Sequence, residues 1–422
     1  MRHLKSFMIY GATIFFNAAI SFATFSLLTH HLSDTDYGII NLYGSSLLLL
    51  IPFIGVGVQY ALSVDYFRQS HEAYRKHFTN ALLIPAATCL LFTLVLLLFH
   101  APVVRFIHAS FFFVLLLPLT GFLTIMNDIM LSLIRNKEKH LLFAGYSIAK
   151  NVLEIGLTLL FILALSYRWE GRLGSTLLTL TAFLLVSVLL IRRWRLYGGG
   201  WDKAEVKKLF VAGLPFVPER LAIFVLMYSD RFFINYYEGT DDVGSYSAGA
   251  QIAIIVNLLI LTLNNTFYPV LFRKLSLPEI DRNEIRKVCY AFVGISAVLT
   301  VCVILAIPFI FELFIGPEFQ SGQRYAVNLT IANFFWSVYS LFLGFLLSYK
   351  KNRLIMSISI FGMIVSLILN FFNVRLFGAL GATYTGMIVY FIMGLTAFYF
   401  SNRLSGLYRL RKPLVPPHQQ QV

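Results

Sequence analysis

Long apolar runs dominate the chain, and short polar segments separate them. Each run holds roughly 20 residues, the length that an α-helix needs to cross the hydrocarbon core of a bilayer. The runs lie at about 6–29, 38–62, 79–100, 109–134, 141–165, 173–191, 209–237, 243–271, 287–315, 324–348, 354–374 and 378–400. This pattern predicts an all-α integral membrane protein with twelve transmembrane helices.

Composition supports the same class of protein. Charged residues make up 13% of the chain, whereas a soluble domain carries about 25%. The three cysteines are scattered and the nine histidines show no ligand spacing, so no disulfide framework or metal site is expected. A phosphate-binding GxxxxGK[ST] loop does not occur, and no cofactor is expected.

Two matches between distant segments indicate an internal repeat. An Asp-x-Gly motif at Asp36 recurs 206 residues later at Asp242, and the segment 168–176 shares five of nine residues with 375–383. Many transporters are fused membrane repeats with the substrate site at the repeat interface. The expected organisation is a six-helix bundle (1–191), a cytoplasmic linker (192–208), a second six-helix bundle (209–402) and a cytoplasmic tail (403–422).

The net charge of +14 predicts orientation rather than a nucleic-acid partner. With the N-terminus inside, the cytoplasmic segments hold 26 of the 34 Lys and Arg residues, as the positive-inside rule requires. Both termini are therefore expected in the cytoplasm, and the two bundles should share one orientation as a parallel repeat. An alternative use of the basic segment 192–195 is contact with anionic lipids. The outer loops hold Arg105, Arg168, Arg172, Arg324 and Arg375.

The seventh run carries the strongest candidate for function. Glu219 and Arg220 lie near its middle, directly after Pro215 and Pro218. Two prolines remove backbone donors and are expected to bend or break the helix there. Charged groups inside a span are costly and mark functional candidates, so we expect a gate or binding site at this bend. The alternative is that Glu219 only neutralises a charge on a neighbouring helix.

Other charged residues inside the spans are further candidates. Lys150 and Glu154 are four residues apart and should share one helix face, near any cavity or simply neutralising each other. Asp230 and Arg231 lie nearer the outer end, where an interfacial pair is the alternative. Asp128 is a weaker candidate of the same kind. Amides inside the spans are expected mainly to bond between helices.

Several short motifs together span essentially the whole chain. They are 213–215, Asp230-Arg231, 243–248, Pro269, 32–38 and 378–383. Together they resemble the Wzx-type polysaccharide flippases of O-antigen and capsule assembly, a branch of the multidrug/oligosaccharidyl-lipid/polysaccharide exporter superfamily. The resemblance implies a MATE-like, V-shaped pair of six-helix bundles with alternating access. Such proteins are similar in moving undecaprenyl-diphosphate-linked oligosaccharides from the inner to the outer leaflet.

The resemblance also implies an energy source, a location and partners, and the negative charge of such a cargo then gives the charged and amide residues inside the spans their expected roles. The energy source would be a proton or sodium gradient, and the location would be the bacterial inner membrane. The partners would be the lipid-linked oligosaccharide, membrane lipids and polysaccharide polymerase machinery, with the transporter working as a monomer. The expected diphosphate ligands are Arg220, Lys150 and Arg231; the ion-coupling or gating residues are Glu219, Glu154, Asp230 and Asp128; the sugar contacts are Asn265, Asn151 and Tyr246.

Two other functions remain open from the residues. A multidrug or small-lipid exporter of the same superfamily would share the fold but would favour acidic cavity groups, because its substrates are often cations. A membrane polysaccharide polymerase or ligase would need a large outer loop with Arg and His, and the longest outer loop here has about ten residues. The chain is therefore not expected to be an enzyme.

Overall fold

The computed structural model describes residues 2–276 and 281–408, and all regular elements within these ranges are helical. Among these residues, eleven helices are long and apolar enough to cross a membrane. The bent pair α8 (Lys203–Gly213) and α9 (Phe216–Tyr228) adds a twelfth if counted as one span. The predicted all-α membrane architecture is confirmed. Residues 409–422 of the predicted tail lie outside the described part of the chain.

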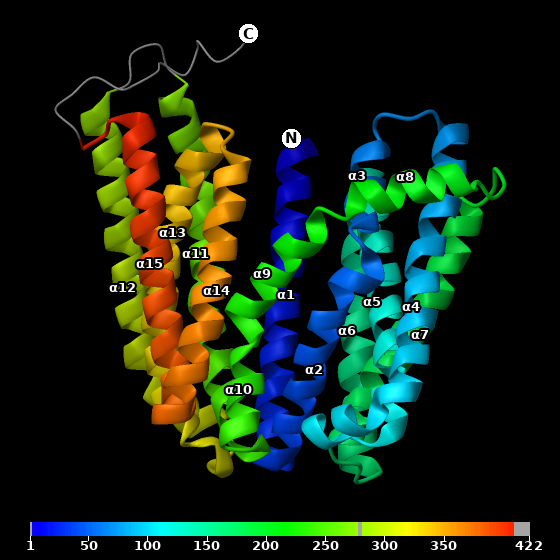
Figure 1. Ribbon diagram of the computed structural model, residues 1–422, viewed down its shortest axis with the longest axis horizontal. Coiled ribbons are helices and arrows are strands. Elements are labelled where there is room, and N and C mark those ends of the chain that lie inside the picture. Colours follow the sequence, from blue (N-terminus) through cyan, green and yellow to red (C-terminus); the bar gives the residue numbers. More distant parts are fainter. Residues whose placement is uncertain (1, 277–280, 409–422) are drawn as a thin grey trace. The chain divides into compact units, whose positions relative to one another are not determined.

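Contacts divide the chain into two compact units, Met1–Leu221 and Ala222–Val422. In the first unit, α5 is the central helix and packs against α2, α4, α6 and α7, while α1 packs on α6 (Figure 1). Besides α8 and the first part of α9, the unit contains α1 (Arg2–His31), α2 (Asp34–Gly55), α3 (Val58–Asp65), α4 (His71–Ile107), α5 (Phe111–Asn136), α6 (His140–Leu159) with the π-helical turn Leu160–Ala164, and α7 (Trp169–Arg193).

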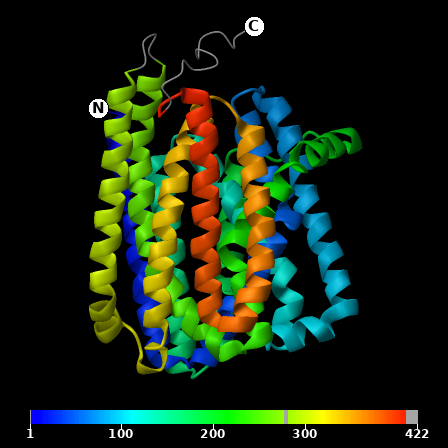
Figure 2. The ribbon, with the colours of Figure 1, turned by 60° about the vertical axis from the view of Figure 1, so that its left-hand side comes forward.

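The second unit repeats this plan around α13, which packs against α11, α12, α14 and α15. Figure 2 shows α15 between α13 and α14. Besides the second part of α9, the unit contains α10 (Asp230–Tyr237), α11 (Thr240–Leu275), α12 (Arg282–Phe314), the short 3-10 helix Pro317–Phe319, α13 (Gly322–Ser348), α14 (Asn352–Phe377) and α15 (Ala379–Ser405).

The order of helix packing supports the duplication. The pairs α2–α5, α5–α7 and α6–α7 of the first unit have their counterparts in α11–α13, α13–α15 and α14–α15 of the second. The two matched sequence motifs also occupy equivalent places, because one begins α2 and α11 and the other begins α7 and α15. The repeated motifs are therefore helix starts of a repeated six-helix plan.

The seventh predicted run forms three helices rather than one. The chain bends by 41° between α8 and α9, at Leu214 and Pro215, so the break predicted from the prolines is confirmed. A second break at Ser229, which lacks a proline, separates α9 from α10. Helix α8 begins at Lys203, inside the predicted linker, because the Asp202 side chain accepts hydrogen bonds from the first free backbone N–H groups.

A close backbone approach positions the first break. Gly213, the last residue of α8, lies against the α2–α3 turn, and a Cβ atom on Gly213 would lie 1.8 Å from the carbonyl oxygen of Val56. Gly57 in the same turn has φ +68° and faces the Gly213 carbonyl. Only glycine permits both the left-handed backbone and this separation. The α8–α9 break is therefore held against α2 and α3 of the same unit.

Gly213→Ala is expected to lower the free energy of unfolding by about 1–3 kcal/mol, because the added Cβ must displace the Val56 carbonyl. Thermal unfolding of the purified protein in detergent measures the effect. Gly145→Ala in α6 is the matched control, since its Cβ would meet no atom within 4 Å. Equal unfolding temperatures for the two variants would contradict the close approach.

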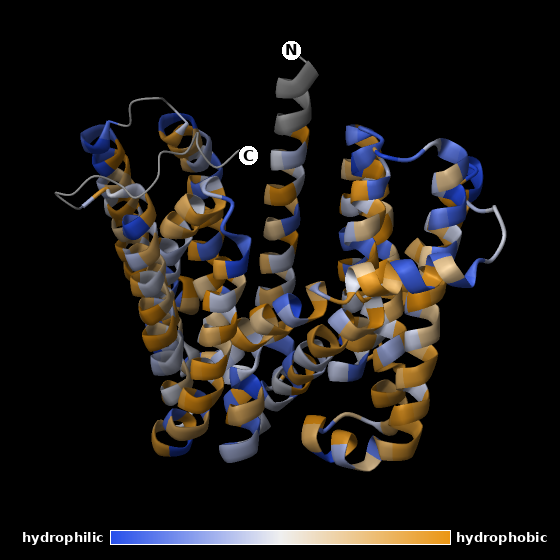
Figure 3. Cartoon of the chain, turned by 45° about the horizontal axis from the view of Figure 1, so that its top comes forward, coloured by the Kyte–Doolittle hydropathy of each residue, from blue (hydrophilic) through white to orange (hydrophobic). Residues whose placement is uncertain are grey.

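The outward faces of the helices carry the lipid contact. Helix α4 is the least buried span of the first unit, and Leu90, Leu94 and Leu98 on it are exposed. In Figure 3 the middles of the long helices are mostly hydrophobic and hydrophilic residues gather near their ends. A row of exposed leucines along the middle of a span is a surface suited to contact with lipid.

Candidate functional site

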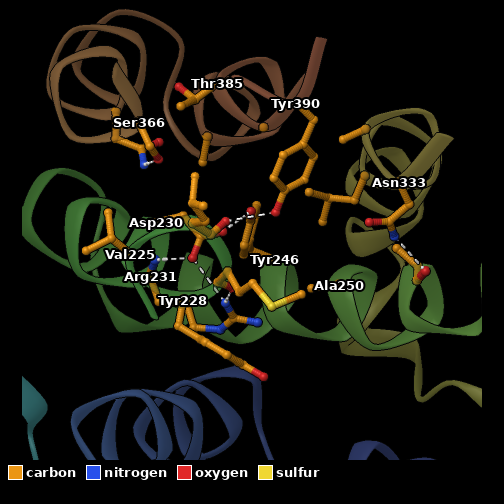
Figure 4. A pocket seen from close by; sticks show the side chains of 18 of the residues that line it. Val225, Tyr228, Asp230, Arg231, Tyr246, Ala250, Asn333, Ser366, Thr385 and Tyr390 are labelled. Carbon is orange, nitrogen blue, oxygen red and sulfur yellow. Dashed lines mark hydrogen bonds and ion pairs between the residues drawn. The ribbon is translucent and has the colours of Figure 1, made fainter. Parts of the chain in front are cut away.

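A small polar cavity lies inside the second unit, near the start of α10. Its volume is about 100 Å³, and α9, α10, α11, α13, α14 and α15 all contribute to its wall (Figure 4). This volume is large enough for several water molecules and too small for a sugar chain. The polar groups that line it are Asp230, Arg231, Tyr246, Asn257, Asn333, Ser366, Asn370, Thr385 and Tyr390.

Asp230 and Arg231 form a buried ion pair in this cavity. Nη1 of Arg231 lies 3.0 Å from Oδ1 of Asp230 and also donates to the Met227 carbonyl at 3.1 Å. The Tyr246 hydroxyl donates to the other carboxylate oxygen of Asp230. Arg231 is only 7% exposed and lies over the rings of Tyr228 and Tyr246. The predicted pair is therefore enclosed by protein.

The opposite wall of the cavity offers neutral oxygen atoms. Oδ1 of Asn370 is buried and has no hydrogen-bond partner among the described residues. The hydroxyls of Ser366 and Thr385 line the same space from α14 and α15. A carboxylate facing an unsatisfied amide oxygen and hydroxyls is a donor set for a hard cation. Within the described residues, no group of three His, Cys, Asp or Glu side chains could hold a metal ion.

Lys150 and Glu154 of the first unit belong to a larger charged group. The predicted i,i+4 contact is present at 3.8 Å, between Nζ of Lys150 and Oε2 of Glu154. Arg172 makes the closer contact, with Nη2 at 2.9 Å from Oε1 of Glu154, and the Thr176 hydroxyl donates to the same oxygen. The assignment of Arg172 to an outer loop was wrong, because α7 begins earlier, at Trp169.

Glu154→Gln is expected to destabilise the first unit, because Arg172 and Lys150 both lose the carboxylate that they contact. Removing one partner costs more than removing both, so Glu154→Gln/Arg172→Gln should recover about 0.5–3 kcal/mol. Thermal unfolding of the single and double variants measures this coupling. The control is Glu170→Gln, near the start of α7, and additive effects of the two changes would contradict the contact.

Arg220 lies at the bent part of the seventh span without a carboxylate partner among the described residues. Its guanidinium lies 4.8 Å from the centre of the Tyr60 ring, and this ring stacks on Phe216 at 5.1 Å. Glu219 is exposed and does not pair with Arg220. Arg220 therefore makes a cation–π contact with Tyr60 and no ion pair with Glu219.

The remaining candidates occupy different surroundings. Asp128 is exposed on α5 and interacts electrostatically with Lys150. Asn265 is exposed on α11, and Asn151 is partly buried on α6. Tyr246 is 1% exposed, so its ring has no free face for a sugar. Its hydroxyl donates a hydrogen bond to Asp230.

The sequence analysis did not identify several residues of these sites. Asn370 was expected only as one of the amides that bond between helices, and Ser366 and Thr385 were not singled out. All three line the cavity of Asp230 from positions more than 130 residues away along the chain, and no local spacing marks them. Arg172 directly precedes the sixth run, so a longer sixth helix would have included it as a charged residue inside a span and as a candidate partner for Glu154.

The comparison with protein families decides the class. The family described as polysaccharide biosynthesis protein matches residues 3–275, which is more than half of the chain. The chain belongs to this family. The family resemblance read from the sequence motifs is thereby confirmed, and the names of several relatives described below are those of transporters or flippases rather than of enzymes.

Two curated relatives of this family member are bacterial proteins. One is a Haemophilus influenzae protein named for the Lsg locus, 25% identical over 155 residues, which are 36% of this chain and 38% of that protein. The other is a Shigella flexneri protein whose name proposes an O-antigen transporter, 21% identical over 227 residues, or 53% of this chain and 54% of that protein. The chain thus spans about half or less of the relatives it matches.

Solved structures show that the fold of this family member is shared with known transporters. The lipid II flippase MurJ in an inward closed conformation has a TM-score of 0.74 at 13% identity, covering 93% of this chain and 87% of that one. An inward-facing multidrug transporter of the MATE family has a TM-score of 0.67 at 16% identity, covering 94% and 96%. The chain is a multi-pass membrane protein by its apolar helices, and it has the fold of these transporters.

Proposed function

We propose that this chain moves an oligosaccharide, linked to undecaprenyl diphosphate, from the inner to the outer leaflet of a bacterial cytoplasmic membrane. The glycan is destined for surface polysaccharide, and polymerase machinery acts on it afterwards. Membership in the polysaccharide biosynthesis family supports the class of cargo. The observation that carries the proposal is Arg220, an exposed guanidinium inside the seventh span with no carboxylate partner among the described residues.

The diphosphate of such a lipid needs a cation in a region of low dielectric. Arg220 suits this role because its planar fork binds two phosphate oxygens at once and remains charged. Stacking on Tyr60 holds the guanidinium plane in place without occupying its donors. Lys150 and Arg231 already contact carboxylates, so in this proposal they act at a distance and Arg220 makes the direct contact.

The coupling ion binds, in this proposal, in the cavity of the second unit. Asp230 supplies the charge, and Asn370, Ser366 and Thr385 supply neutral oxygen ligands. A sodium ion or proton at Asp230 weakens the ion pair with Arg231, because the bound ion and the guanidinium of Arg231 compete for the same carboxylate. Asp230 directly follows the break at Ser229 between α9 and α10, so ion occupancy can alter the bend of the seventh span.

The coupling residues complete a cycle of alternating access in a monomer with both termini in the cytoplasm. Binding at Arg220, near the start of α9, and ion binding at Asp230, just after its end, both act on the same broken span. A ligand shifts an equilibrium between two conformations only by its differential affinity for them. We propose that the seventh span changes its bend at the two breaks that flank α9, and that the cargo and the ion each bind one of the two bent forms more tightly than the other.

Depletion of the protein in its native host tests the function. The proposal predicts that a diphosphate-linked oligosaccharide accumulates on the inner leaflet, where a membrane-impermeant sugar probe does not reach it in intact cells. Restoring the protein should relieve the accumulation, and lipid analysis identifies the cargo. Unchanged lipid-linked glycan together with normal surface polysaccharide would reject the flippase and favour drug or small-lipid export.

A further inference from the structure

The segment between α7 and α8 is docked onto the first turns of α4. The Thr79 hydroxyl donates to the Gly198 carbonyl and accepts from its N–H, both at 2.9 Å. The Asn80 side chain donates to the Gly200 carbonyl at 3.1 Å and accepts from the Asp202 N–H at 2.8 Å. These four bonds all reach the backbone of the segment, so they fix the course of this backbone along α4.

Two glycines bring this backbone into direct contact with α4. A Cβ on Gly199 would lie 2.7 Å from the Lys76 Cβ, and one on Gly198 would lie 2.5 Å from a guanidinium nitrogen of Arg75. Both glycines have positive φ, +143° for Gly198 and +87° for Gly199, which other residues rarely adopt. Gly198 and Gly199 are therefore packed closely against α4 and do not form a flexible tether.

The large aromatic side chains of the docked segment point away from it. Tyr197 is 66% exposed and Trp201 is 72% exposed, although the backbone on either side is bonded to α4. Exposing two large aromatic rings on a fixed backbone is unfavourable in water. Tyr and Trp are the residues that favour the boundary between lipid headgroups and hydrocarbon.

The exposed charged side chains of the segment around these rings are basic, because its acidic side chains contact other groups of the first unit. Asp202 pairs with Lys76 at 2.7 Å and caps α8, and Glu205 contacts the His77 ring at 2.6 Å. The exposed basic residues are Arg192, Arg193, Arg195, Lys203, Lys207 and Lys208.

The neighbouring α5–α6 turn extends the basic surface. Nζ of Lys137 and Nζ of Lys139 each lie 5.1 Å from the centre of the Trp194 ring, so the two ammonium groups are within about 10 Å of each other. Neither lysine has an ion-pair partner in the described residues. Partial burial lowers the pKa of Lys137, and a neighbouring anion would offset this cost.

The docked segment lies at the end of a lipid-facing helix. The segment is attached to α4 at Thr79 and Asn80. Leu90, on the exposed face of α4, lies about ten residues further along the helix, which is a distance of roughly 15 Å. This spacing places the rings of Tyr197 and Trp201 at headgroup depth when Leu90 is in hydrocarbon. A bilayer surface therefore explains the exposure of these rings better than a soluble protein partner does.

From these observations we infer that segment 192–208, with Lys137 and Lys139, is a binding surface for the phosphate headgroups of anionic phospholipids. The inference does not depend on the identity of the transported cargo. The aromatic rings enter the headgroup region and the basic side chains select negative lipids, as polybasic segments do at the cytoplasmic leaflet. The rigid docking on α4 lets this surface fix the depth of the first unit in the membrane.

Quenching of Trp201 fluorescence by brominated phospholipids tests the inference in the full-length protein in liposomes. The Trp201 contribution is the difference between the wild type and Trp201→Phe, which keeps all backbone bonds to α4. At equal mole fractions, brominated phosphatidylglycerol should quench this contribution at least about twofold more than brominated phosphatidylcholine. Aqueous iodide should quench it weakly.

A charge variant and its control identify the groups responsible. Arg193→Gln/Arg195→Gln/Lys203→Gln should bring the ratio of the two lipids to about one, and about 0.5 M salt should do the same to the wild type. Lys287→Gln/Lys350→Gln/Arg353→Gln removes as much charge from exposed positions of the second unit and should leave the ratio unchanged. Quenching by iodide but by neither brominated lipid, or equal quenching by both lipids in the wild type, would overturn the inference; the first result would indicate a protein partner or open solvent.

Discussion

Arg220→Gln is expected to reduce transport of the diphosphate-linked glycan by at least about tenfold, while the folded protein reaches the membrane in normal amount. The loss follows from the charge-assisted hydrogen bonds between a guanidinium and phosphate, which contribute roughly 1.5–3 kcal/mol. Stability should change little, because the Arg220 side chain is exposed and pairs with no carboxylate among the described residues. Transport of the labelled lipid in membrane vesicles measures the effect.

Two further arginine variants sharpen this test. Arg220→Lys keeps the positive charge but loses the planar fork, so transport should fall to an intermediate rate. Arg353→Gln, at an exposed position of α14, removes one charge elsewhere and should transport normally. Wild-type transport by Arg220→Gln would exclude direct contact between Arg220 and the diphosphate.

Asp230→Asn is expected to cause two losses. Arg231 remains buried without its counter-charge, so the free energy of unfolding should fall by about 3–5 kcal/mol. The cavity also loses its only carboxylate among the described residues, so whatever transport persists should no longer respond to a sodium or proton gradient. Thermal unfolding and transport with and without each gradient measure the two effects separately.

The double variant Asp230→Asn/Arg231→Gln separates stability from coupling. It removes both charges of the pair and should recover most of the lost stability, because no uncompensated charge stays buried. Its transport should remain independent of the gradients. Glu312→Gln, an exposed carboxylate of α12, is the control and should retain both properties. Gradient-driven transport by the stable double variant would contradict a coupling role for Asp230.

Local features of the fold were predictable because their causes are local. Proline lacks the backbone N–H that continues a helix, so Pro215 and Pro218 marked the break between α8 and α9. The 20-residue apolar runs marked the spans, and the spacing of Lys150 and Glu154 placed both side chains on one face of α6. Each of these inferences needs only the geometry of a single helix.

Features that depend on packing between helices were not predictable. The contact of Arg172 with Glu154 joins two helices, and the break at Ser229 has no proline or glycine to mark it. The cavity of the second unit exists because Asn370 and Asp230 meet from helices far apart in the chain. A single sequence shows which charged and polar side chains are unfavourable in lipid, but it does not show which residues of other helices compensate them.

The measurement that tests the central claim most directly uses purified protein in liposomes with a fluorescent undecaprenyl-diphosphate oligosaccharide in the starting leaflet. A membrane-impermeant sugar-binding probe follows its arrival in the opposite leaflet after a sodium or proton gradient is imposed. The account predicts transfer at least about tenfold faster with wild-type protein than in protein-free liposomes, and a return to background with Arg220→Gln. Transfer at the background rate by folded wild-type protein under both gradients would contradict it.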